Sequence, residues 1–542
     1  TKNISLESRW RMPPASLFQA PASSICRQFY CVEPWGGQAD LSAKNRLQAG
    51  LDYLTGKLPG VLVFLAVYTV CWTIIPYFSN SGLPVDTIEE VAWSREWLLG
   101  IYRHPPMMIW LVGVAWKVMG GWIGSPYVAS GLALSVGLIF MYMLVRMTRP
   151  ASQAGLVVLT TPLVYFFGPQ LPQWNANIAQ LPFVGLFLYA AFRGVMGRSP
   201  GWTLAAGLAA GAGLLGKYSF ALIPLFAAIG LLADPLSRAR VRPLHILAAF
   251  AVAVAVFLPH VWWFFTAPMN TVDYFRMSAE RTEGTALGHL TSPILVVLGA
   301  AGVLIPVILI AVRGLDHTPG GRTHPVLDRC LKMFLGFVVL GPVAIAAFIG
   351  ALGGGLIKDQ WMIAYLLPAP ALVVLMVVPA GVDVNWRKSA AIFYIAALVV
   401  LAIAYPAERQ AHYLRAKPGE PVLWAPLMPA EPMARAGEAL WNKTVAAAGK
   451  PAMPIAIVAG GPEAAGVANV TPGRPAWFEH YNQGFSPWIK DGDIRSHGIL
   501  ATEPPPAGFA EEHGLCVAAQ ENFDWRNGRG GQGRLATLTV LL

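Results

Sequence analysis

Long apolar stretches constrain this chain more than any other feature of its sequence. Eleven such stretches occur, and those at 58–78, 127–145, 244–265 and 290–312 are each about long enough to cross a bilayer core of roughly 30 Å, while 389–405 is marginal. Of the 542 residues, 55% are hydrophobic and only 13% are charged. A soluble core cannot cover that much apolar surface, so the composition predicts a mostly α-helical, polytopic membrane protein.

The charged residues that flank these stretches predict the orientation. Basic clusters follow alternate stretches, and positive charge collects on the cytoplasmic side of a membrane. These clusters are Arg146/Arg149, Arg193/Arg198, Arg238/Arg240/Arg242, Arg313/Arg322/Arg329/Lys332 and Arg387/Lys388. They account for the net charge of +10 without a nucleic-acid partner. The pattern predicts eleven spans with the N-terminus inside and the C-terminus outside, provided that 105–120 lies at the interface; the count changes by one if that segment crosses.

Three regions follow from this topology. Residues 1–57 are polar and lack the short apolar core of a signal peptide, which predicts a partly disordered cytoplasmic leader. Residues 58–406 form the predicted membrane domain. Residues 407–542 turn abruptly to Pro, Gly and polar residues, and predict a small α/β domain with strands near 454–461 and 535–542 and a helix near 438–448. Together with the lone Cys516 of this region, the topology predicts a bacterial inner-membrane protein whose C-terminal domain is periplasmic.

Polar and aromatic residues gather at the predicted external ends of the spans. They come from five loops: Asp86, Glu89, Glu90, Arg103 and His104; Asn175 and Asn177; Lys217; His260; Lys358 and Trp361. Each alone is explained most simply as a solvated loop end or, for Trp361, as part of an interfacial aromatic belt. Because five loops supply such groups at similar depth, we expect one external site.

The first external loop carries the strongest pattern. Helical spacing places Asp86, Glu89 and Glu90 on one face, although Asp86 could instead cap that helix. Downstream, Pro105 and Pro106 hold His104 in a stiff, non-helical turn.

An acidic residue followed by a basic residue and Pro-Pro resembles the first external loop of GT-C glycosyltransferases. The chain looks most like the branch of protein O-mannosyltransferases and lipid A aminoarabinose transferases. Leu215-Gly216-Lys217-Tyr218, the 358–361 loop and the long loop after His260 resemble further elements of that branch, so the resemblance covers roughly 58–406. Family members often carry a second acidic residue where this chain has Asn175 and Asn177.

The resemblance implies a polyprenyl-phosphate sugar donor and an envelope glycan, lipid or protein as acceptor, with membrane lipids around the enzyme. In that chemistry we expect Asp86 to act as the base, with Glu89 and His104 as further catalytic residues. Arg103, Lys217 and Lys358 would bind the donor phosphate, and Asn175, Asn177, His260 and Trp361 would contact substrate. No cofactor is indicated, and a divalent metal stays open because the second acidic ligand is missing.

A transporter or flippase of lipid-linked intermediates is the alternative function. Transporters place ionisable residues near the midplane and often carry inverted repeats, and neither feature is apparent in this sequence. No dinucleotide-binding, P-loop, HExxH or GxSxG element occurs in a fitting context.

Overall fold

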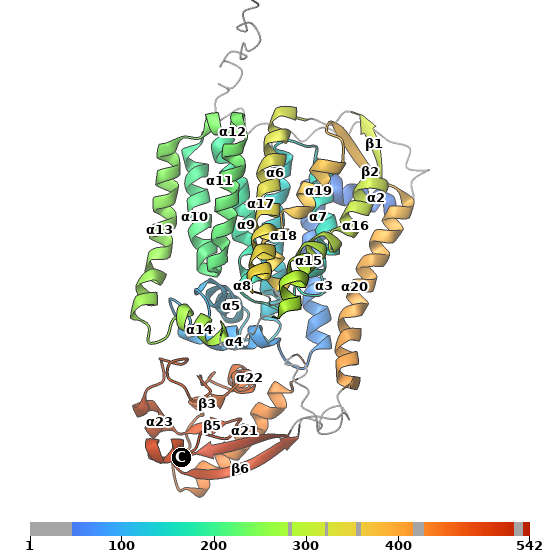
Figure 1. The fold of residues 1–542 in the computed structure, drawn as a ribbon. Helices are drawn as coiled ribbons and strands as arrows, with labels where there is room; N and C mark the ends of the chain where they lie inside the picture. Colours follow the sequence, from blue (N-terminus) through green and yellow to red (C-terminus); the bar gives the residue numbers. More distant parts are fainter. Residues whose placement is uncertain are drawn as a thin grey trace, which may run out of the picture. The chain divides into compact units, whose positions relative to one another are not determined.

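A computed structural model describes residues 46–279, 285–319, 323–353, 359–415, 426, 428–524 and 535–542. The chain divides into two compact units, of which the second, Leu47–Leu542, holds nearly all of the described residues. This second unit is mostly helical (Figure 1). The helices up to residue 415 are α2 (Arg46–Gly56), α3 (Leu58–Ser79), α4 (Val85–Trp93), α5 (Met107–Val118), α6 (Ser125–Arg146), α7 (Ala151–Thr160), α8 (Ala176–Ala179), α9 (Leu181–Met196), α10 (Pro200–Gly216), α11 (Leu222–Ala233), α12 (Pro235–Arg240), α13 (Pro243–Thr266), α14 (Thr271–Ala279), α15 (Ala286–Gly302), α16 (Ile305–Arg313), α17 (Pro325–Gly353), α18 (Ile363–Leu366), α19 (Ala369–Val377) and α20 (Lys388–Arg415).

Seven helical segments within the described residues are long and apolar enough to cross a membrane: α3, α6, α8–α9, α13, α15–α16, α17 and α20. A pair bent by 48°, Gln360–Leu366 and Ala369–Val377, would make an eighth. The chain is therefore a polytopic membrane protein, but length and composition do not by themselves give eleven spans, and that number stays a prediction. Three further apolar helices, α7, α10 and α11, have only 10, 17 and 12 residues and fall short of that length.

Helix α13 shows why this bundle needs a bilayer. Its mean hydropathy is 2.2, yet only 6% of its apolar window is buried within the protein. The only buried side chain along its 24 residues is His260. A continuous apolar face of this length requires hydrocarbon around it.

The interior helices pack closely because glycines face one another. A Cβ at Gly185 of α9 would lie 2.4 Å from the carbonyl oxygen of Gly137 on α6. Likewise, a Cβ at Gly207 of α10 would lie 2.2 Å from the carbonyl oxygen of Ala249 on α13. Small residues let membrane helices approach to this distance, where van der Waals contact holds them together.

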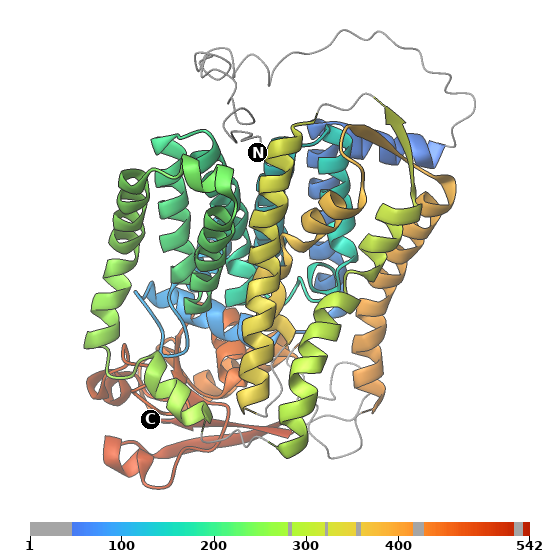
Figure 2. The same ribbon diagram turned by 45° about the horizontal axis from the view of Figure 1, so that its top comes forward.

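The two ends of the bundle differ in chemistry. At one end lie α12, with its arginines, and the antiparallel pair β1 (Leu315–Pro319) and β2 (Val382–Trp386) (Figures 1 and 2). There Arg149 is buried and pairs with Asp328 at 2.6 Å. At the opposite end lie α4, α14 and the C-terminal domain (Figure 1). The arginines of α12 and the pair of Arg149 with Asp328 therefore mark one end of the bundle, and which end faces the cytoplasm stays a prediction.

Helix α5 makes up most of the segment 105–120, and the predicted number of spans depends on whether this segment crosses the membrane. Its 12 residues extend about 18 Å at 1.5 Å per residue, which is too short for a bilayer core.

The C-terminal region forms a five-stranded sheet with flanking helices. Its elements are α21 (Ala430–Ala447), β3 (Ile457–Gly460), α22 (Pro462–Val470), β4 (Ala476–Glu479), α23 (Asp491–His497), β5 (Ile499–Ala501), α24 (Phe509–His513), β6 (Val517–Asp524) and β7 (Leu535–Leu541). The strand order is β4-β3-β5-β7-β6; β3 pairs in parallel with β4 and β5, and the other pairs are antiparallel.

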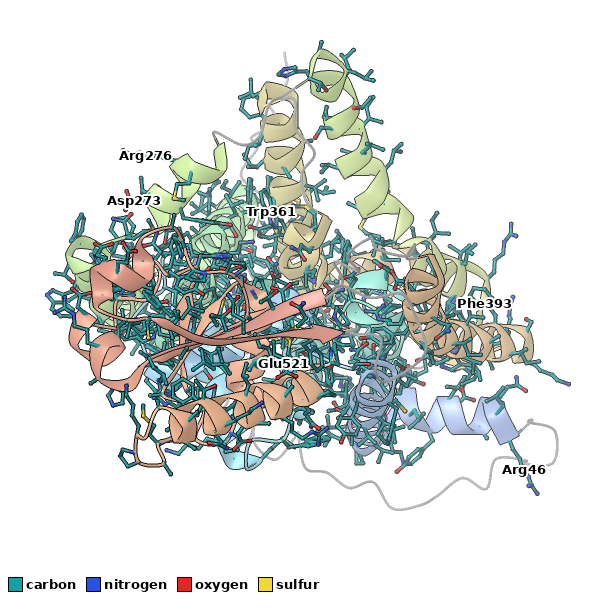
Figure 3. All side chains as sticks on the ribbon, turned by 90° about the horizontal axis from the view of Figure 1, so that it is seen from below. Arg46, Asp273, Arg276, Trp361, Phe393 and Glu521 are labelled. Atoms are coloured by element: carbon teal, nitrogen blue, oxygen red, sulfur yellow. The ribbon has the colours of Figure 1, made fainter. Side chains whose placement is uncertain are left out.

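Both predicted strands and the predicted helix of this region are confirmed, as β3, β7 and α21. In Figure 3, Asp273 and Arg276 of α14 and Trp361 lie to one side of β6, which carries Glu521. The domain boundaries at 57 and 406 stay predictions, and α20 continues past residue 406 to Arg415.

Candidate active site

Helix α4 presents an acidic first turn beside the second external loop. Its N-cap is Pro84, and Asp86 lies within the first turn with an exposed side chain, so Asp86 does not occupy the cap position. The Thr87 hydroxyl donates to the carbonyl of Trp174 (3.0 Å), and the Trp174 indole donates to the carbonyl of Met108 (3.2 Å). These bonds fix α4 against α5 and the second loop.

A cluster centred on Arg103 joins α4 to the C-terminal domain. The guanidinium contacts Glu89 Oε2 at 2.5 Å and Glu479 Oε1 at 2.8 Å. Its Nε donates to the Tyr102 hydroxyl at 2.7 Å, and that hydroxyl donates to Glu479 Oε1 at 2.6 Å. The same guanidinium lies over the ring of Trp93, with 5.3 Å between its carbon and the ring centroid. The positive charge of Arg103 is thus neutralised by acids of the protein itself.

Two carboxyl groups share this single cation. Glu89 and Glu479 are 3% and 1% exposed. Burial raises the pKa of Glu89 to about 8, although Arg103 opposes the rise, and burial also raises the pKa of Glu479. One guanidinium neutralises one carboxylate, so the cluster holds a proton on the second carboxyl near neutral pH.

Glu90 is a second buried acid on α4. It is 3% exposed, and its Oε2 has no hydrogen-bond partner within the described part of the chain. Burial, followed by the charges of Asp86 and Glu89, raises its pKa well above the ordinary range. The protonated form of Glu90 is therefore favoured beside the exposed side chain of Asp86.

His104 sits in the predicted stiff turn. Ile101 and His104 exchange backbone hydrogen bonds of 3.0 and 3.1 Å, and Pro105 and Pro106 follow. Burial, then the nearby charges of Lys217 and Arg103, lower the pKa of His104 to about 3. Its imidazole is therefore neutral at physiological pH, and it offers a hydrogen-bond donor and acceptor instead of a positive charge.

The second and third loops meet at Lys217. Its Nζ donates to Asn177 Oδ1 at 2.9 Å and lies 5.3 Å from the ring centroid of Trp361. Asn175 has a structural role, because its side chain caps α8 by accepting from the backbone of Asn177 (2.8 Å) and Ile178 (3.3 Å).

His260 anchors α13 to the first loop. Its Nδ1 lies 2.8 Å from the carbonyl oxygen of Leu99, and its Nε2 lies 2.7 Å from the Tyr218 hydroxyl. A carbonyl can only accept, so Nδ1 carries the proton and Nε2 accepts from Tyr218. With 1% exposure, His260 has no free surface for substrate.

The structure therefore brings some of the predicted site residues together. Arg103 pairs with Glu89, and Lys217 contacts Asn177 and Trp361. Asp86 lies near enough to Glu89, and His104 near enough to Lys217 and Arg103, for their charges to shift the pKa of the neighbour. Asn175 and His260 serve the scaffold, and Lys358 lies outside the described residues. Sequence reasoning missed Tyr102 and Glu479 as members of the cluster. The only signal for Glu479 is an acid at the end of an apolar strand, Ala476–Glu479.

The same residues leave little room for a metal held by two acids. Among the described residues, no three His, Cys, Asp or Glu side chains are placed to hold one ion. The second-loop oxygen nearest to this role, Asn177 Oδ1, accepts from Lys217.

Comparison with known proteins shows which enzymes this chain is similar to. Residues 103–263 match the model of the family described as dolichyl-phosphate-mannose-protein mannosyltransferase. The chain is 28% identical over 343 residues to the lipopolysaccharide core galacturonosyltransferase RgtA of Rhizobium johnstonii. This match covers 61% of this chain and 66% of RgtA. It is also 28% identical over 234 residues to the lipid A galacturonosyltransferase RgtD of the same organism, covering 41% and 47%. These matches support a membrane glycosyltransferase of the GT-C superfamily.

The matched region of this GT-C protein contains His104, Asn177, Lys217 and His260 but not Asp86. The chain spans about two thirds of the length of RgtA and about half that of RgtD. Among solved structures, the apo form of ArnT from Cupriavidus metallidurans aligns with a TM-score of 0.49 and 14% identity over 88% of this chain and 97% of that one.

Proposed function

We propose that this GT-C protein transfers a sugar from a polyprenyl-phosphate donor to an envelope glycolipid or glycan at the periplasmic face of the bacterial inner membrane. The observation that carries the proposal is the group of charged and polar residues from Asp86 to Lys217 at the end of an apolar bundle. The matched family is described with a dolichyl-phosphate donor, and the two relatives act on lipopolysaccharide core and lipid A.

In the proposed reaction, the acceptor hydroxyl attacks the anomeric carbon of the donor sugar. The bond between that carbon and the phosphate oxygen breaks, and the polyprenyl phosphate leaves with the electron pair. Asp86 takes the acceptor proton, as its exposed position on α4 allows. Lys217 stabilises the charge that develops on the phosphate, and the neutral His104 donates a hydrogen bond to it.

Arg103 has a different role in this proposal from the phosphate contact expected from the sequence. Its guanidinium is shared by Glu89 and Glu479, so it fixes the first loop to the C-terminal domain. Glu89 therefore supports Asp86 through the position of α4.

The transporter alternative receives no support from the placement of charge. In the described residues, the buried pair of Arg149 and Asp328 lies near one end of the bundle, and the cluster of Glu89 and Arg103 lies at the other. A transporter of anionic lipids would instead place such groups near the midplane.

Transfer assays with the purified protein, polyprenyl-phosphate sugars and an envelope extract test the proposal. We expect Asp86→Asn to lower kcat by roughly 10²–10⁴-fold, because a carboxamide cannot accept the proton. Asp491→Asn is the matched control, since Asp491 is also an exposed acid in the first turn of a helix. Equal transfer by both variants, or donor binding without transfer to any acceptor, would overturn the assignment.

A chelator arm tests metal dependence in the same assay. Because Asn177 replaces the second acid and is held by Lys217, we expect transfer to survive chelation within about twofold of the untreated rate. Loss of transfer, restored by a divalent cation, would contradict this expectation.

A further inference from the structure

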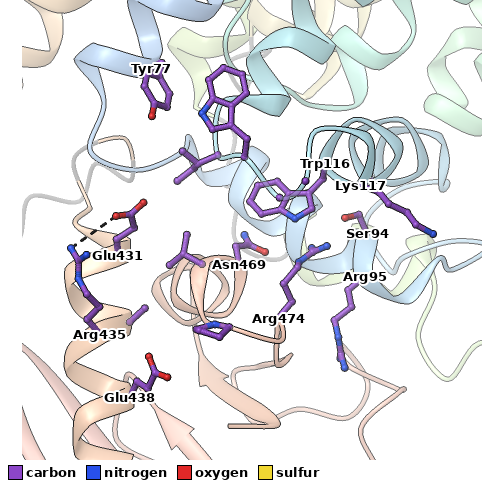
Figure 4. Close-up of a pocket in the computed structure, with 18 of the residues that line it drawn as sticks. Tyr77, Ser94, Arg95, Trp116, Lys117, Glu431, Arg435, Glu438, Asn469 and Arg474 are labelled. Carbon is purple, nitrogen blue, oxygen red and sulfur yellow. Dashed lines mark ion pairs between the residues drawn. The ribbon is translucent and has the colours of Figure 1, made fainter. Parts of the chain in front are cut away.

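A cavity of about 860 Å³ lies between the first external loop and the helices of the C-terminal domain (Figure 4). Its lining comes from Tyr77, from Ser94, Arg95 and Trp97, from α5 and the turn after it, and from α21, α22 and the segment that follows α22. None of the residues predicted to be catalytic or to bind donor lines this cavity. Its chemistry therefore needs its own explanation.

One wall of the cavity is basic. Arg95, Lys117 and Arg474 line it and come from three separate segments of the chain (Figure 4). Burial and the repulsion of Arg95 lower the pKa of Arg474 to about 10, so Arg474 remains a cation at neutral pH. Within the part of the chain that the structure describes, Arg95 pairs with its neighbour Glu96, while Lys117 and Arg474 have no ion pair.

Arg474 is held in place by contacts that leave its charge uncompensated. Its guanidinium donates to the carbonyl of Val91 at the end of α4 and lies 5.1 Å from the ring centroid of Trp116. Neither contact supplies a negative charge. A cation that is partly removed from water beside another cation is stabilised when an anion binds between them.

Aromatic side chains accompany the charges. Trp97, Trp116 and Trp122 all line the cavity. Trp97 is 47% exposed and has a left-handed backbone (φ 47°, ψ 40°), which is unfavourable for a bulky residue. The exposed indole ring of Trp97 suits the apolar face of a sugar ring.

The wall opposite is formed by α21 and has hydrogen-bonding acids. Glu431 and Glu438 line it, and Arg435 lies 4.0 Å from Glu431 as a loose, exposed pair. Carboxylates accept hydrogen bonds from hydroxyl groups. The cavity therefore offers cations on one wall, hydroxyl acceptors on the other and aromatic rings between them.

We propose that this cavity binds an anionic saccharide portion of the acceptor, with its carboxylate or phosphate at Arg95, Lys117 and Arg474. The proposal rests on the proposed function and adds the acceptor class to it. Helix α4 links the two places: Asp86 is in its first turn, and Ser94 and Arg95 follow its last residue. Its nine residues span about 13 Å, a distance that an oligosaccharide bridges.

Binding to the full-length protein in detergent, measured by titration calorimetry, tests the site without any donor. The probes are tetragalacturonate and the neutral maltotetraose. We expect tetragalacturonate to bind and maltotetraose to bind at least roughly tenfold more weakly, with affinity for the anion falling as salt rises. The exposed pair Arg95→Gln and Lys117→Gln, combined, should weaken tetragalacturonate binding by about tenfold or more.

Lys443→Gln is the charge-matched control, because Lys443 is an exposed cation on α21 that does not line the cavity. The proposal is overturned by equal binding of the two probes, or by equal losses in the double variant and the control. It is also overturned if glycerol phosphate displaces tetragalacturonate at equal concentration, because the cavity would then be a lipid-headgroup site.

Kinetics separate this proposal from the proposed function. With a transferred sugar as readout, the double variant should raise the KM for the acceptor about tenfold while kcat and the KM for the donor stay unchanged. An unchanged acceptor KM refutes the cavity's role and leaves the glycosyltransferase intact. Absence of transfer by the parent protein refutes the function and leaves the binding result standing.

Discussion

At the scale of single residues, the sharing of one guanidinium by two buried carboxyls predicts a pH-dependent stability. The pKa of Glu89 is about 8 in the folded protein, against 4.5 for an exposed glutamate. The folded state therefore keeps a proton that the unfolded chain releases, and this contribution is complete below about pH 4.5 and lost as pH rises through 8. Between pH 7 and 9 we expect a loss of about 1 kcal/mol, seen as a falling thermal midpoint.

Glu479→Gln tests this explanation directly. With one carboxyl removed, Arg103 fully compensates Glu89, whose pKa then falls, and the slope of the thermal midpoint above pH 7 flattens. Glu431→Gln, a change at an exposed acid, should keep the slope of the parent protein. A parent midpoint that is constant from pH 7 to 9 would show that the carboxyls do not share a proton.

The sequence indicates part of this site and conceals the rest for a physical reason. Charged residues within apolar spans are rare, and several external loops supply charged or polar groups at similar depth, so Asp86, Glu89, His104 and Lys217 can be found as a group without a structure. The partner of Arg103 on the C-terminal domain is 376 residues away, and only the docking of that domain makes Glu479 a member of the cluster. The sequence also cannot tell whether Asn175 caps a helix or binds a ligand, because both roles use the same side-chain oxygen.

At the scale of elements, the short helix α8 predicts that Asn175 acts through Lys217. Asn175→Ala removes the cap, costs about 1 kcal/mol and frees the turn that holds Asn177 Oδ1 against Lys217. We expect a lower thermal midpoint and a raised KM for the donor. Asn175→Ser retains a capping hydroxyl and should restore both; failure of serine to do so would indicate that Asn175 contacts substrate itself.

The contact of α6 with α9 predicts that one methyl group is costly at a specific glycine. Gly185→Ala places a Cβ 2.4 Å from the carbonyl oxygen of Gly137, so the helices must separate, at a cost of about 1–3 kcal/mol. Gly299→Ala on α15 is the matched control, since nothing lies within 4 Å of its Cβ. Thermal unfolding in detergent should show a lower midpoint for the first variant only. Equal midpoints would mean that this helix contact contributes little.

Elements also show the limit of hydropathy as a guide. The long apolar stretches at 58–78 and 244–265 become the single helices α3 and α13, as their length predicts. Elsewhere the apolar pattern continues through Thr161–Leu163 and through the 48° bend between α18 and α19. A window of hydropathy cannot detect a break in backbone hydrogen bonding when the residues on both sides are equally apolar.

At the scale of the whole molecule, the two chemically distinct ends predict where reagents reach the protein from. The arginines of α12 lie at one end of the bundle, and the C-terminal domain with the exposed Cys516 lies at the other (Figure 1). Positive charge marks the cytoplasmic side, so Cys516 should face the periplasm. A membrane-impermeant maleimide should therefore label Cys516 in intact spheroplasts.

The labelling experiment also needs a cysteine at the opposite end of the bundle, and the other cysteines of the chain must not react with the maleimide. Cys26 and Cys31 are replaced by serine, Cys330 is buried, and Cys71 lies on α3, within a candidate span, where a charged reagent does not enter. Arg238→Cys, at an exposed position of α12 in a Cys516→Ser chain, should react only after permeabilisation. The reverse pattern would invert the orientation and place Asp86 and Lys217 in the cytoplasm, where nucleotide sugars are available. The proposed lipid-linked donor would then lose its physical reason, which makes this simple measurement a test of the chemistry as well as of the topology.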